Sequence, residues 1–450
     1  MSVLGKQNMY FIGIGGIGMS ALARYFYNLG KQIAGYDRTS TDLTSELIAL
    51  GIDIHFEDDI SSIDQNYLDP EQTLVVYTPA IPENHSELTY FKKHGFIIMK
   101  RAEVLGLITE ESVCLAVAGT HGKTTTTSIL GHLLYECEVE LTAFLGGIAE
   151  NYNSNLILKG NEVSVVEADE FDRSFLKLSP DFACITSMDA DHLDIYGTKE
   201  QLVESFTAFT KCLKPGGKLF LAFGLPLHGI SCGIEEPADY SAENIKIKDG
   251  AYMFDLKTPA FRFEKFKFNL PGRHNLSNAV IALAMAIEYG CAPYRLARAL
   301  ASYQGVKRRF TYQIKTDDLV FIDDYAHHPE EINAVHQAVR EMYPDEQVMV
   351  VFQPHLFSRT RDFAEEFANS LAQFDEVVLL EIYPAREKPI EGISSSWLLN
   401  KIDHENKRLI GKMDIVSAIQ KSRARIIMTL GAGDIGEEVE HIKEKLSLAC

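Results

Sequence analysis

The sequence is poor in the features that mark secreted, membrane-embedded or nucleic-acid-binding proteins. Its 450 residues contain only seven cysteines, scattered and without a CxxC pair, which argues against a disulfide framework or a zinc site. Positive charge is scarce, and a net charge of -20 disfavours a nucleic acid partner. No apolar run approaches the roughly 20 residues of a membrane helix, and the N-terminus lacks the form of a signal peptide. We therefore expect a soluble, cytoplasmic protein without membrane insertion.

The chain instead alternates short apolar runs with longer amphipathic stretches, a pattern typical of parallel sheets covered by helices. Its length suits two to four domains at roughly 100–200 residues each. The sequence therefore predicts the α/β fold class. The runs predicted as strands are Tyr10–Gly13, Leu74–Tyr77, Val113–Ala118, Val163–Val166, Leu319–Ile322, Val348–Phe352, Val377–Leu380 and Ile426–Leu430.

Two turn-rich zones indicate domain boundaries. One lies near Gly106–Ser112, and the other near Gly305–Arg309. We predict three domains, at 1–108, 109–307 and 308–450. The looser pattern of residues 222–268 predicts a β-rich addition to the central domain.

A first glycine loop, Gly13-Ile-Gly-Gly-Ile-Gly18, lies between a predicted strand and the predicted helix Met19–Leu29. Such glycines allow backbone N–H groups at a helix N-terminus to approach a phosphate. Asp37 follows a second strand, where a dinucleotide site holds a ribose hydroxyl. The loop predicts a phosphate-containing ligand, and a simple turn is the alternative. It does not separate NAD from a UDP pyrophosphate.

A second glycine loop, Gly119-Thr-His-Gly-Lys-Thr124, follows the strand Val113–Ala118. In phosphate loops the Lys reaches the β- and γ-phosphates and the next hydroxyl binds Mg²⁺. This loop is shorter than the usual G-x-x-x-x-G-K-[ST], because Val117 stands where the leading glycine is expected. A threonine-rich helix start is the alternative, but consecutive threonines are poor helix formers. We predict nucleotide binding.

Acidic residues follow the strand Val163–Val166. Glu167-Ala-Asp-Glu170 stands where an Mg²⁺ ligand lies beside a phosphate loop, and a solvated turn is the alternative. A second oxygen-rich run, Ser187–Asp194, contains His192. Histidine is not a typical Mg²⁺ ligand, so its chemistry alone leaves His192 undecided.

Polar motifs continue toward the C-terminus. Asn275 stands before the predicted helix Leu276–Tyr289, as an N-cap or as a ligand contact. Lys307-Arg308-Arg309 is either a solvated linker or a phosphate site. The polar residues of Asp323–Pro329 and Phe352–Arg361 follow two strands, so we expect them to face one cleft, with independent surface turns as the alternative. Thr429–Ile435 is a further glycine loop, with a simple turn as the alternative.

Together these residues resemble the Mur ligase family, and they occur in the family's order along nearly the whole chain. Each motif alone is modest support, whereas their joint order is specific. Leu356 departs from the pattern, since some relatives carry Arg there. The resemblance rests on Gly13–Ser20, Gly119–Thr125, Glu167–Glu170, His274-Asn275, Arg308-Arg309, Asp323–Pro329, Phe352–His355 with Arg359, and Gly431–Ile435.

The resemblance implies an N-terminal Rossmann-like domain that binds UDP-substrate, a central P-loop ATPase domain with a mainly parallel sheet, and a C-terminal Rossmann-like domain. The third domain would close on ATP and bind the amino acid. The implied reaction joins L-alanine to the lactyl carboxylate of UDP-N-acetylmuramate through an acyl phosphate, giving ADP and phosphate. It implies ATP and Mg²⁺ at two sites, with Mn²⁺ able to substitute. We expect a monomer or weak dimer.

The resemblance also implies a role for individual residues. UDP-substrate binding falls to Gly15, Gly16, Ile17, Gly18, Asp37, Thr78 and Arg101. ATP binding falls to Gly119, Thr120, His121, Gly122, Lys123, Thr124, Thr125, Asn275, Arg309 and Asp324. Amino-acid binding falls to Tyr325, His327, His355 and Arg359, and the metal ligands are Thr124, Glu167 and His192. The catalytic residues are Lys123, Arg309 and His327, the last handling the proton of the amine.

Three other hypotheses stay open at this point. A sister ligase of wall recycling would add a tripeptide by the same chemistry. An NAD-dependent oxidoreductase would use the first glycine loop but leave Lys123 and Glu167 without a role. A nucleotide-binding regulatory protein would leave the polar strand ends of the third domain unexplained.

Overall fold

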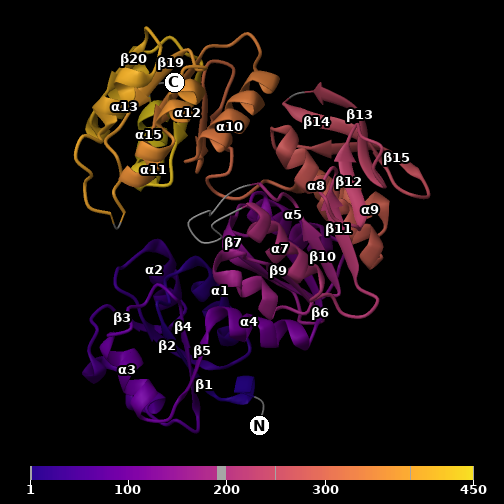
Figure 1. Ribbon diagram of the computed structural model, residues 1–450, viewed down its shortest axis with the longest axis vertical. Helices are drawn as coiled ribbons and strands as arrows, with labels where there is room; N and C mark the ends of the chain where they lie inside the picture. The colour runs from indigo at the N-terminus through magenta and orange to yellow at the C-terminus, as the bar shows by residue number, and fades with distance from the viewer. Residues whose placement is uncertain (1–2, 190–198, 249, 386, 449–450) are drawn as a thin grey trace. The chain divides into compact units, whose positions relative to one another are not determined.

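The computed structural model describes residues 3–189, 199–248, 250–385 and 387–448. It contains three β-sheets, one in each predicted domain (Figure 1). The chain divides into two compact units, of which the first comprises residues 1–245, 253–268 and 277–304, and the second comprises residues 246–252, 269–276 and 305–450. Within the described ranges, no helix is both long and apolar enough for a membrane span.

The first sheet has five strands in the order β3-β2-β1-β4-β5, all paired in parallel. Its central strand β1 (Asn8–Ile12) is buried along its whole length, because neighbours cover both faces of the sheet. The other strands are β2 (Gln32–Tyr36), β3 (Asp53–His55), β4 (Thr73–Tyr77) and β5 (Ile97–Lys100). The helices are α1 (Ile17–Asn28), α2 (Asp42–Ala49), α3 (Ser86–Lys93) and α4 (Arg101–Glu110), with short 3-10 turns at Val3–Gly5, Ile60–Ser62 and Gln65–Tyr67.

The second sheet has ten strands in the order β15-β14-β13-β12-β11-β10-β6-β9-β7-β8. Strand β6 (Val113–Ala118) pairs in parallel with β9 and β10, so the strand that leads into the second glycine loop lies inside the sheet. The β-rich addition predicted for residues 222–268 is confirmed by β12 to β15. The other strands are β7 (Leu141–Ala149), β8 (Ser154–Leu158), β9 (Val163–Glu167), β10 (Phe182–Ile185), β11 (Lys218–Ala222), β12 (Ile230–Ile234), β13 (Tyr240–Lys248), β14 (Ala251–Lys257) and β15 (Arg262–Phe268). The helices are α5 (Lys123–Glu136), α7 (Lys199–Thr210), α8 (Arg273–Tyr289) and α9 (Pro293–Ser302), with a 3-10 segment at Phe171–Lys177.

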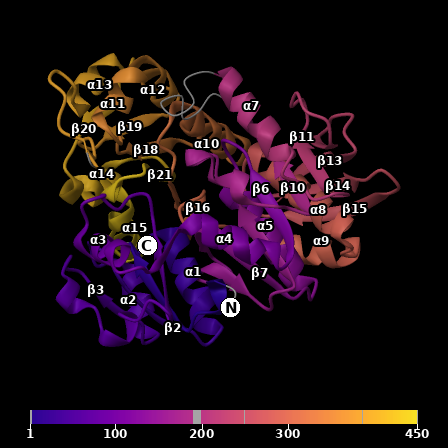
Figure 2. The ribbon, with the colours of Figure 1, turned by 60° about the horizontal axis from the view of Figure 1, so that its bottom comes forward.

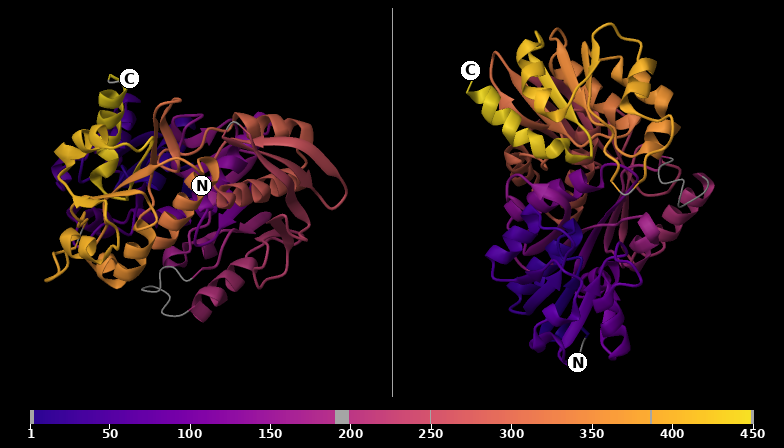
Figure 3. Two further views of the ribbon diagram at one scale, coloured as in Figure 1. Left: turned by 90° about the horizontal axis from the view of Figure 1, so that it is seen from above. Right: turned by 90° about the vertical axis from the view of Figure 1, so that its left-hand side faces the viewer.

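The third sheet has six strands in the order β16-β17-β21-β18-β19-β20, and only the edge strand β16 runs antiparallel. Apolar clusters lie on both of its faces, and helices cover them as Figure 3 shows. The strands are β16 (Thr311–Lys315), β17 (Val320–Asp324), β18 (Val348–Phe352), β19 (Glu376–Leu379), β20 (Lys407–Leu409) and β21 (Ile426–Leu430). The helices are α10 (Pro329–Met342), α11 (Phe357–Asp362), α12 (Ala364–Leu371), α13 (Ser395–Lys401), α14 (Ile415–Lys421) and α15 (Glu438–Ser447), with 3-10 turns at Lys412–Asp414 and Asp434–Glu437.

Helix α1 joins the first two domains, because it packs against β7 and β8 of the second sheet (Figure 2). The rings of Tyr25 and Phe144 meet edge to face with their centroids 5.3 Å apart. The buried amide of Asn155 donates hydrogen bonds to the carbonyl of Ile17 (2.6 Å) and the hydroxyl of Ser20 (2.8 Å). One continuous apolar core therefore runs through both domains.

Candidate active site

The first glycine loop turns the chain from β1 into α1, as the sequence predicts. The N–H groups of Gly13 and Ile14 donate to the carbonyl of Tyr36 at the end of β2. Asp37 accepts the N–H of Gly15 at 2.7 Å and that of Thr39 at 3.3 Å. Asp37 thus shapes the loop itself in this structure, and its predicted contact with the UDP-substrate stays a prediction.

Arg101 brings a positive charge to the N-terminal end of α1. A Cβ built on Gly18 would lie 2.7 Å from the Nη1 atom of Arg101, so the guanidinium can lie there only because residue 18 is glycine. A helix N-terminus and a guanidinium both favour a phosphate. Thr78, which follows β4, lines the same place. The structure thus brings Arg101 and Thr78 to the first glycine loop.

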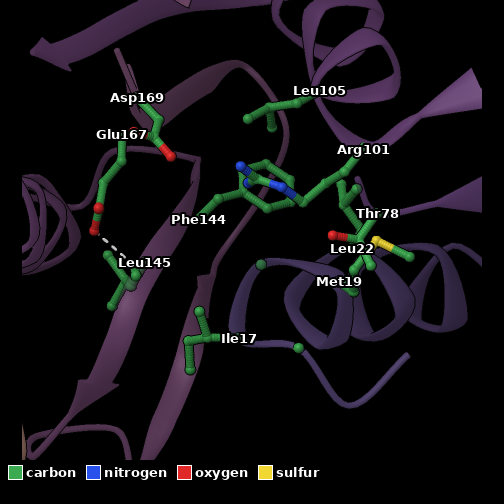
Figure 4. Close-up of a pocket in the computed structure, with 13 residues that line it drawn as sticks. Ile17, Met19, Leu22, Thr78, Arg101, Leu105, Phe144, Leu145, Glu167 and Asp169 are labelled. Carbon is green, nitrogen blue, oxygen red and sulfur yellow. Dashed lines mark hydrogen bonds between the residues drawn. The ribbon is translucent and has the colours of Figure 1, made fainter. Parts of the chain in front are cut away.

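A pocket of about 350 Å³ extends from this loop into the central domain. Figure 4 shows Arg101 and Thr78 on one side of it and the carboxylates of Glu167 and Asp169 on the other. The pocket is lined by Gly16, Ile17, Gly18, Met19, Leu22, Thr78, Arg101, Leu105, Phe144, Leu145, Gly146, Glu167 and Asp169. A single cavity therefore connects the first glycine loop with the acidic end of β9.

The second glycine loop connects β6 with α5, and Lys123 is the first residue of that helix. The Nζ atom of Lys123 donates to the carbonyl of Gly119 at 2.7 Å and forms an ion pair with Glu170 at 2.8 Å. The side chain of Glu170 has no exposed surface, and burial raises the pKa of its carboxyl group, which Lys123 partly offsets. The buried carboxylate of Glu170 therefore holds the lysine of the loop that is predicted to bind phosphate.

Thr124 and Glu167 meet beside the loop, at the position predicted for a metal. The Thr124 hydroxyl donates to Glu167 at 3.1 Å, and the N–H of Gly146 donates to the same carboxylate at 2.6 Å. Burial raises the pKa of Glu167, and these donors and Lys123 oppose that rise. Together with Asp169 in the pocket, these are the hard oxygen donors that Mg²⁺ prefers, so the residues present fit this ion. His192, the third predicted ligand, lies outside the described residues.

The rest of the second loop is anchored by Ser187, which follows β10. The Ser187 hydroxyl accepts the N–H of His121 at 2.8 Å and lies 2.9 Å from the hydroxyl of Thr120. Thr125 is buried in the first turn of α5. The predicted ATP-binding residues of this loop thus form one rigid turn.

Asn275 is not an N-cap. Helix α8 already begins at Arg273, so Asn275 lies inside its first turn, and the N-cap interpretation is wrong. Its side-chain amide donates to the carbonyl of Pro271 at 2.7 Å. The predicted contact with ATP stays a prediction.

Two residues of the cationic trio, Arg308 and Arg309, lie at the start of the third domain. Arg308 bonds Asp323 at 3.0 Å and the carbonyl of Gly431 at 2.6 Å, so it ties the ends of β17 and β21 together. The guanidinium groups of both arginines also face the ring of Tyr325, that of Arg308 at 5.2 Å and that of Arg309 at 5.7 Å from the ring centre. The hydrogen bonds of Arg308 give it a structural task in this domain, and the predicted role of Arg309 toward phosphate stays a prediction.

Asp324 is buried at the end of β17. Its carboxylate accepts the N–H of Phe310 at 2.6 Å and that of Ala326 at 2.7 Å. Burial raises its pKa to about 6, although Arg309 and these two bonds act in the opposite direction. In this structure Asp324 holds the loop that leads to Tyr325, and its predicted part in ATP binding stays a prediction.

Two histidines lie close together where β17 and β18 end. The ring centroids of His327 and His355 are 6.0 Å apart, and that of Tyr325 is 5.4 Å from that of His327. The Nη1 atom of Arg359 lies 3.4 Å from the Nδ1 atom of His355. The two loops thus lie close together although β21 separates their strands, because the carboxyl ends of parallel strands meet at the same edge of a sheet.

The pKa of both imidazoles is lowered, which favours the neutral form at pH 7. Burial lowers the pKa of His327, with Arg359 adding to that effect and Glu331 opposing it. The Nδ1 atom of His327 lies 3.0 Å from the carbonyl of Tyr325, so it must carry the proton, and Nε2 keeps the lone pair. Burial lowers the pKa of His355 to about 4, helped by His327 and Arg359.

Sequence reasoning missed several residues that build the site. Phe144 forms a wall of the pocket, and Asn155 anchors the helix behind the first glycine loop. Tyr383 stacks on His355 with ring centroids 5.8 Å apart. No motif surrounds these residues, and their partners lie far away in the chain, so no local pattern could have found them.

The fold and the site together define a class. A phosphate loop with Lys, Thr and an acidic strand end belongs to enzymes that use a nucleoside triphosphate. The N-terminus of a second helix, α1, lines a cavity together with that acidic end, and the third domain carries a separate cluster of histidine and arginine. The fold and the site are therefore those of an enzyme that uses a nucleoside triphosphate.

The chain belongs to the Mur ligase family. Three family descriptions match in order: "Mur ligase family, catalytic domain" over residues 8–112, "Mur ligase middle domain" over 117–286, and "Mur ligase, glutamate ligase domain" over 308–435. The chain is 61% identical over 441 residues to a UDP-N-acetylmuramate--L-alanine ligase of Christiangramia forsetii, covering 98% of each chain. It is 60% identical over 440 residues to the ligase of the same name from Flavobacterium psychrophilum, again covering 98% of each.

A solved structure agrees with this assignment. The UDP-N-acetylmuramate-alanine ligase of Thermotoga maritima superposes with a TM-score of 0.83 at 28% identity, covering 98% of this chain and 100% of that chain. The predicted α/β fold with three domains, the predicted enzyme class and the resemblance are thereby confirmed. The oxidoreductase and the regulatory protein are excluded as descriptions of this chain.

Proposed function

We propose that this protein joins L-alanine to the lactyl carboxylate of UDP-N-acetylmuramate, with ATP converted to ADP and phosphate, in the synthesis of peptidoglycan precursors. The observation that carries the proposal is the cavity that connects the first glycine loop and Arg101 with Glu167 and Asp169. A UDP group bound at Arg101 would direct the rest of the substrate along this cavity toward the second loop. The names of the two relatives that are about 60% identical over nearly the whole chain support the same substrates.

The first chemical step is a phosphoryl transfer. The lactyl carboxylate oxygen attacks the γ-phosphorus of ATP, and the bond to the β-phosphate oxygen breaks to release ADP. Catalysis of such a step depends on positioning and on neutralising charge. Lys123 would leave Glu170 to contact the β- and γ-phosphates, and Arg309 would add positive charge. Thr124 and Glu167 would hold a first Mg²⁺, which would neutralise charge on the phosphate oxygens. We extend the proposal to a second metal site with His192, and Mn²⁺ could replace Mg²⁺ at these sites.

The second step forms the amide. The amine of alanine attacks the carbonyl carbon of the acyl phosphate, and the carbon–oxygen bond breaks to release phosphate. Tyr325, His327, His355 and Arg359 form the proposed amino-acid site. The neutral His327 would take the proton of the amine on Nε2, since Nδ1 already donates to the carbonyl of Tyr325.

The proposal is tested by measuring phosphate release. With ATP, Mg²⁺ and UDP-N-acetylmuramate present, amino acids and the wall tripeptide are added one at a time. We expect L-alanine to give the highest kcat/KM. Rapid release with the tripeptide and none with alanine would instead identify the sister ligase of wall recycling.

A pH prediction follows from His327. Because its pKa lies below 6.5, it is neutral at pH 7 and becomes protonated as the pH falls through that lowered pKa. We expect kcat/KM for alanine to fall on the acidic side of pH 6.5 in the native enzyme. In His327→Asn, kcat should drop by roughly 10²-fold or more, and this acidic limb should disappear. The kcat/KM for alanine from pH 5 to 9 is the measurement, and an unchanged profile in the variant would remove His327 from proton transfer.

A further inference from the structure

His355 is held by the segment of the third domain that follows β19 and contains Tyr383 and Glu387. Tyr383 donates its backbone N–H to the carbonyl of Pro354 at 2.8 Å, and its own carbonyl accepts the N–H of Leu356 at 2.9 Å. His355 and Tyr383 thus form a parallel bridge, and their rings stack at 18° with centroids 5.8 Å apart. Backbone and side chain of Tyr383 both fix the position of the imidazole.

The same segment fixes the start of α11, which carries Arg359. Glu387 accepts the backbone N–H of Ser358 at 3.0 Å and also the hydroxyl of that serine. Leu356, just before the helix, has φ +72°, a left-handed conformation that is unfavourable for a leucine. Such a conformation persists only when the surroundings enforce it. The bonds from Tyr383 and Glu387 on either side of Leu356 supply that enforcement.

The third glycine loop, Thr429–Ile435 after β21, packs against the side chain of Tyr383. A Cβ built on Gly433 would lie 2.7 Å from the Cβ atom and 2.8 Å from the Cγ atom of Tyr383, so only glycine leaves room for that side chain. Gln353 fastens the loop by donating to Asp434 at 2.7 Å and accepting the N–H of Ile435 at 2.9 Å. The glycine motif at the end of β21 therefore has a task that requires no phosphate.

The groups positioned in this way suit a carboxylate. Arg359 can only donate, so its approach at 3.4 Å makes Nδ1 of His355 an acceptor and places the proton of the neutral imidazole on Nε2. A guanidinium and an imidazole N–H are then adjacent donors. His355 precedes α11 and Arg359 lies in its first turn, so both belong to the short stretch that the segment after β19 holds in place.

We propose that Tyr383 and Glu387 are positioning residues for the amino-acid substrate, which hold His355 and Arg359 as a donor pair for its carboxylate group, with Gly433 as the support behind Tyr383. This inference rests on the proposed function, in which His355 and Arg359 receive alanine. The segment after β19 and the third glycine loop then have one common purpose, which is to position His355 and Arg359.

The test compares substitutions that remove the support with substitutions that keep it. Tyr383→Ala removes the stacked ring, whereas Tyr383→Phe keeps it. We expect Tyr383→Ala to raise the KM for alanine by roughly 10- to 100-fold, because small displacements of positioning groups cost up to about 10²-fold. Tyr383→Phe should stay near the native value. The KM for ATP and for UDP-N-acetylmuramate should change less than about 2-fold in both variants.

Two further variants keep the test decisive if Tyr383→Ala folds poorly. Gly433→Ala pushes on Tyr383 from behind, and Glu387→Ala frees the start of α11. Both should raise the KM for alanine selectively. Glu387→Ala should melt near the native protein, whereas Gly433→Ala should melt lower because its Cβ meets Tyr383 and Gln353. Equal rises in all three KM values, or a lowered melting temperature with no change in the KM for alanine, would show a purely structural role and overturn the inference.

The inference and the proposed function fail in different ways. If another amino acid or a peptide proves to be the acceptor, the proposed function falls. The same KM comparison with that acceptor then still decides whether Tyr383 and Glu387 position the donor pair. If alanine is the acceptor and its KM does not respond to these variants, the inference alone falls.

Discussion

Replacing Lys123 with alanine is expected to lower the kcat for phosphate release by at least about 10²–10³-fold, the usual cost of losing one preorganised electrostatic stabiliser. Lys123 stands at the N-terminus of α5, within 2.7 Å of the carbonyl of Gly119, and it is the cation of the second glycine loop. In the proposed role, the loss of Lys123 removes a positive charge from the loop that would hold the γ-phosphate during transfer. The measurement is kcat at saturating ATP, UDP-N-acetylmuramate and alanine.

The ion pair with Glu170 makes a matched control necessary. Removing Lys123 alone leaves a fully buried carboxylate without its cation, a change that costs about 3–5 kcal/mol in typical proteins. Part of any activity loss would then reflect stability. In Lys123→Ala with Glu170→Gln the buried charge is absent, so we expect the melting temperature to recover while kcat stays low. Near-native turnover in this double variant would exclude the proposed catalytic role of Lys123.

Replacing Glu167 with alanine is expected to have an effect of similar size, about 10²–10³-fold in kcat. Its carboxylate lies at the end of the pocket, 3.1 Å from the Thr124 hydroxyl that would share the metal. Loss of one charged ligand weakens the attraction for Mg²⁺, so the Mg²⁺ concentration for half-maximal rate should rise. Magnesium titrations of kcat, repeated with Mn²⁺, provide the measurement.

Glu167→Gln is the isosteric control for that experiment. The amide oxygen can still accept the N–H of Gly146, which bonds the native carboxylate at 2.6 Å, so the local turn should survive. The negative charge is lost in both variants. We therefore expect Gln to behave like Ala in Mg²⁺ dependence and like the native protein in thermal melting. An unchanged Mg²⁺ requirement in Glu167→Gln would exclude Glu167 as a metal ligand.

The sequence predicted the parts of the fold that depend on local pattern. Strands β6, β18 and β21 begin and end at the residues expected from their apolar runs, because buried parallel strands are continuously apolar. The first and second glycine loops also lie between a strand and a helix as predicted. Local chemistry suffices there, since turn, phosphate contact and helix start involve residues adjacent in the chain.

The remaining features depend on contacts between distant residues. Strand β21 inserts between β17 and β18, which brings Gly431 to Arg308 across 123 positions of the chain. Nothing near Arg308 indicates that it bonds a carbonyl rather than a phosphate. The same holds for Glu170, which looks like part of an acidic metal site but forms an ion pair with Lys123. These contacts depend on the order of the strands in the sheet, and a local sequence pattern carries no information about that order.

The core shared through α1 has a consequence for exchanging parts between homologous enzymes. Tyr25 packs on Phe144, and Asn155 bonds the first turn of the same helix. A chimera that takes its N-terminal domain from a distant relative would break the aromatic pair and could remove the Ser20 hydroxyl that the buried amide of Asn155 bonds at 2.8 Å. The first two domains should therefore be inherited together, as a single module, whereas the third sheet has its own apolar clusters on both faces.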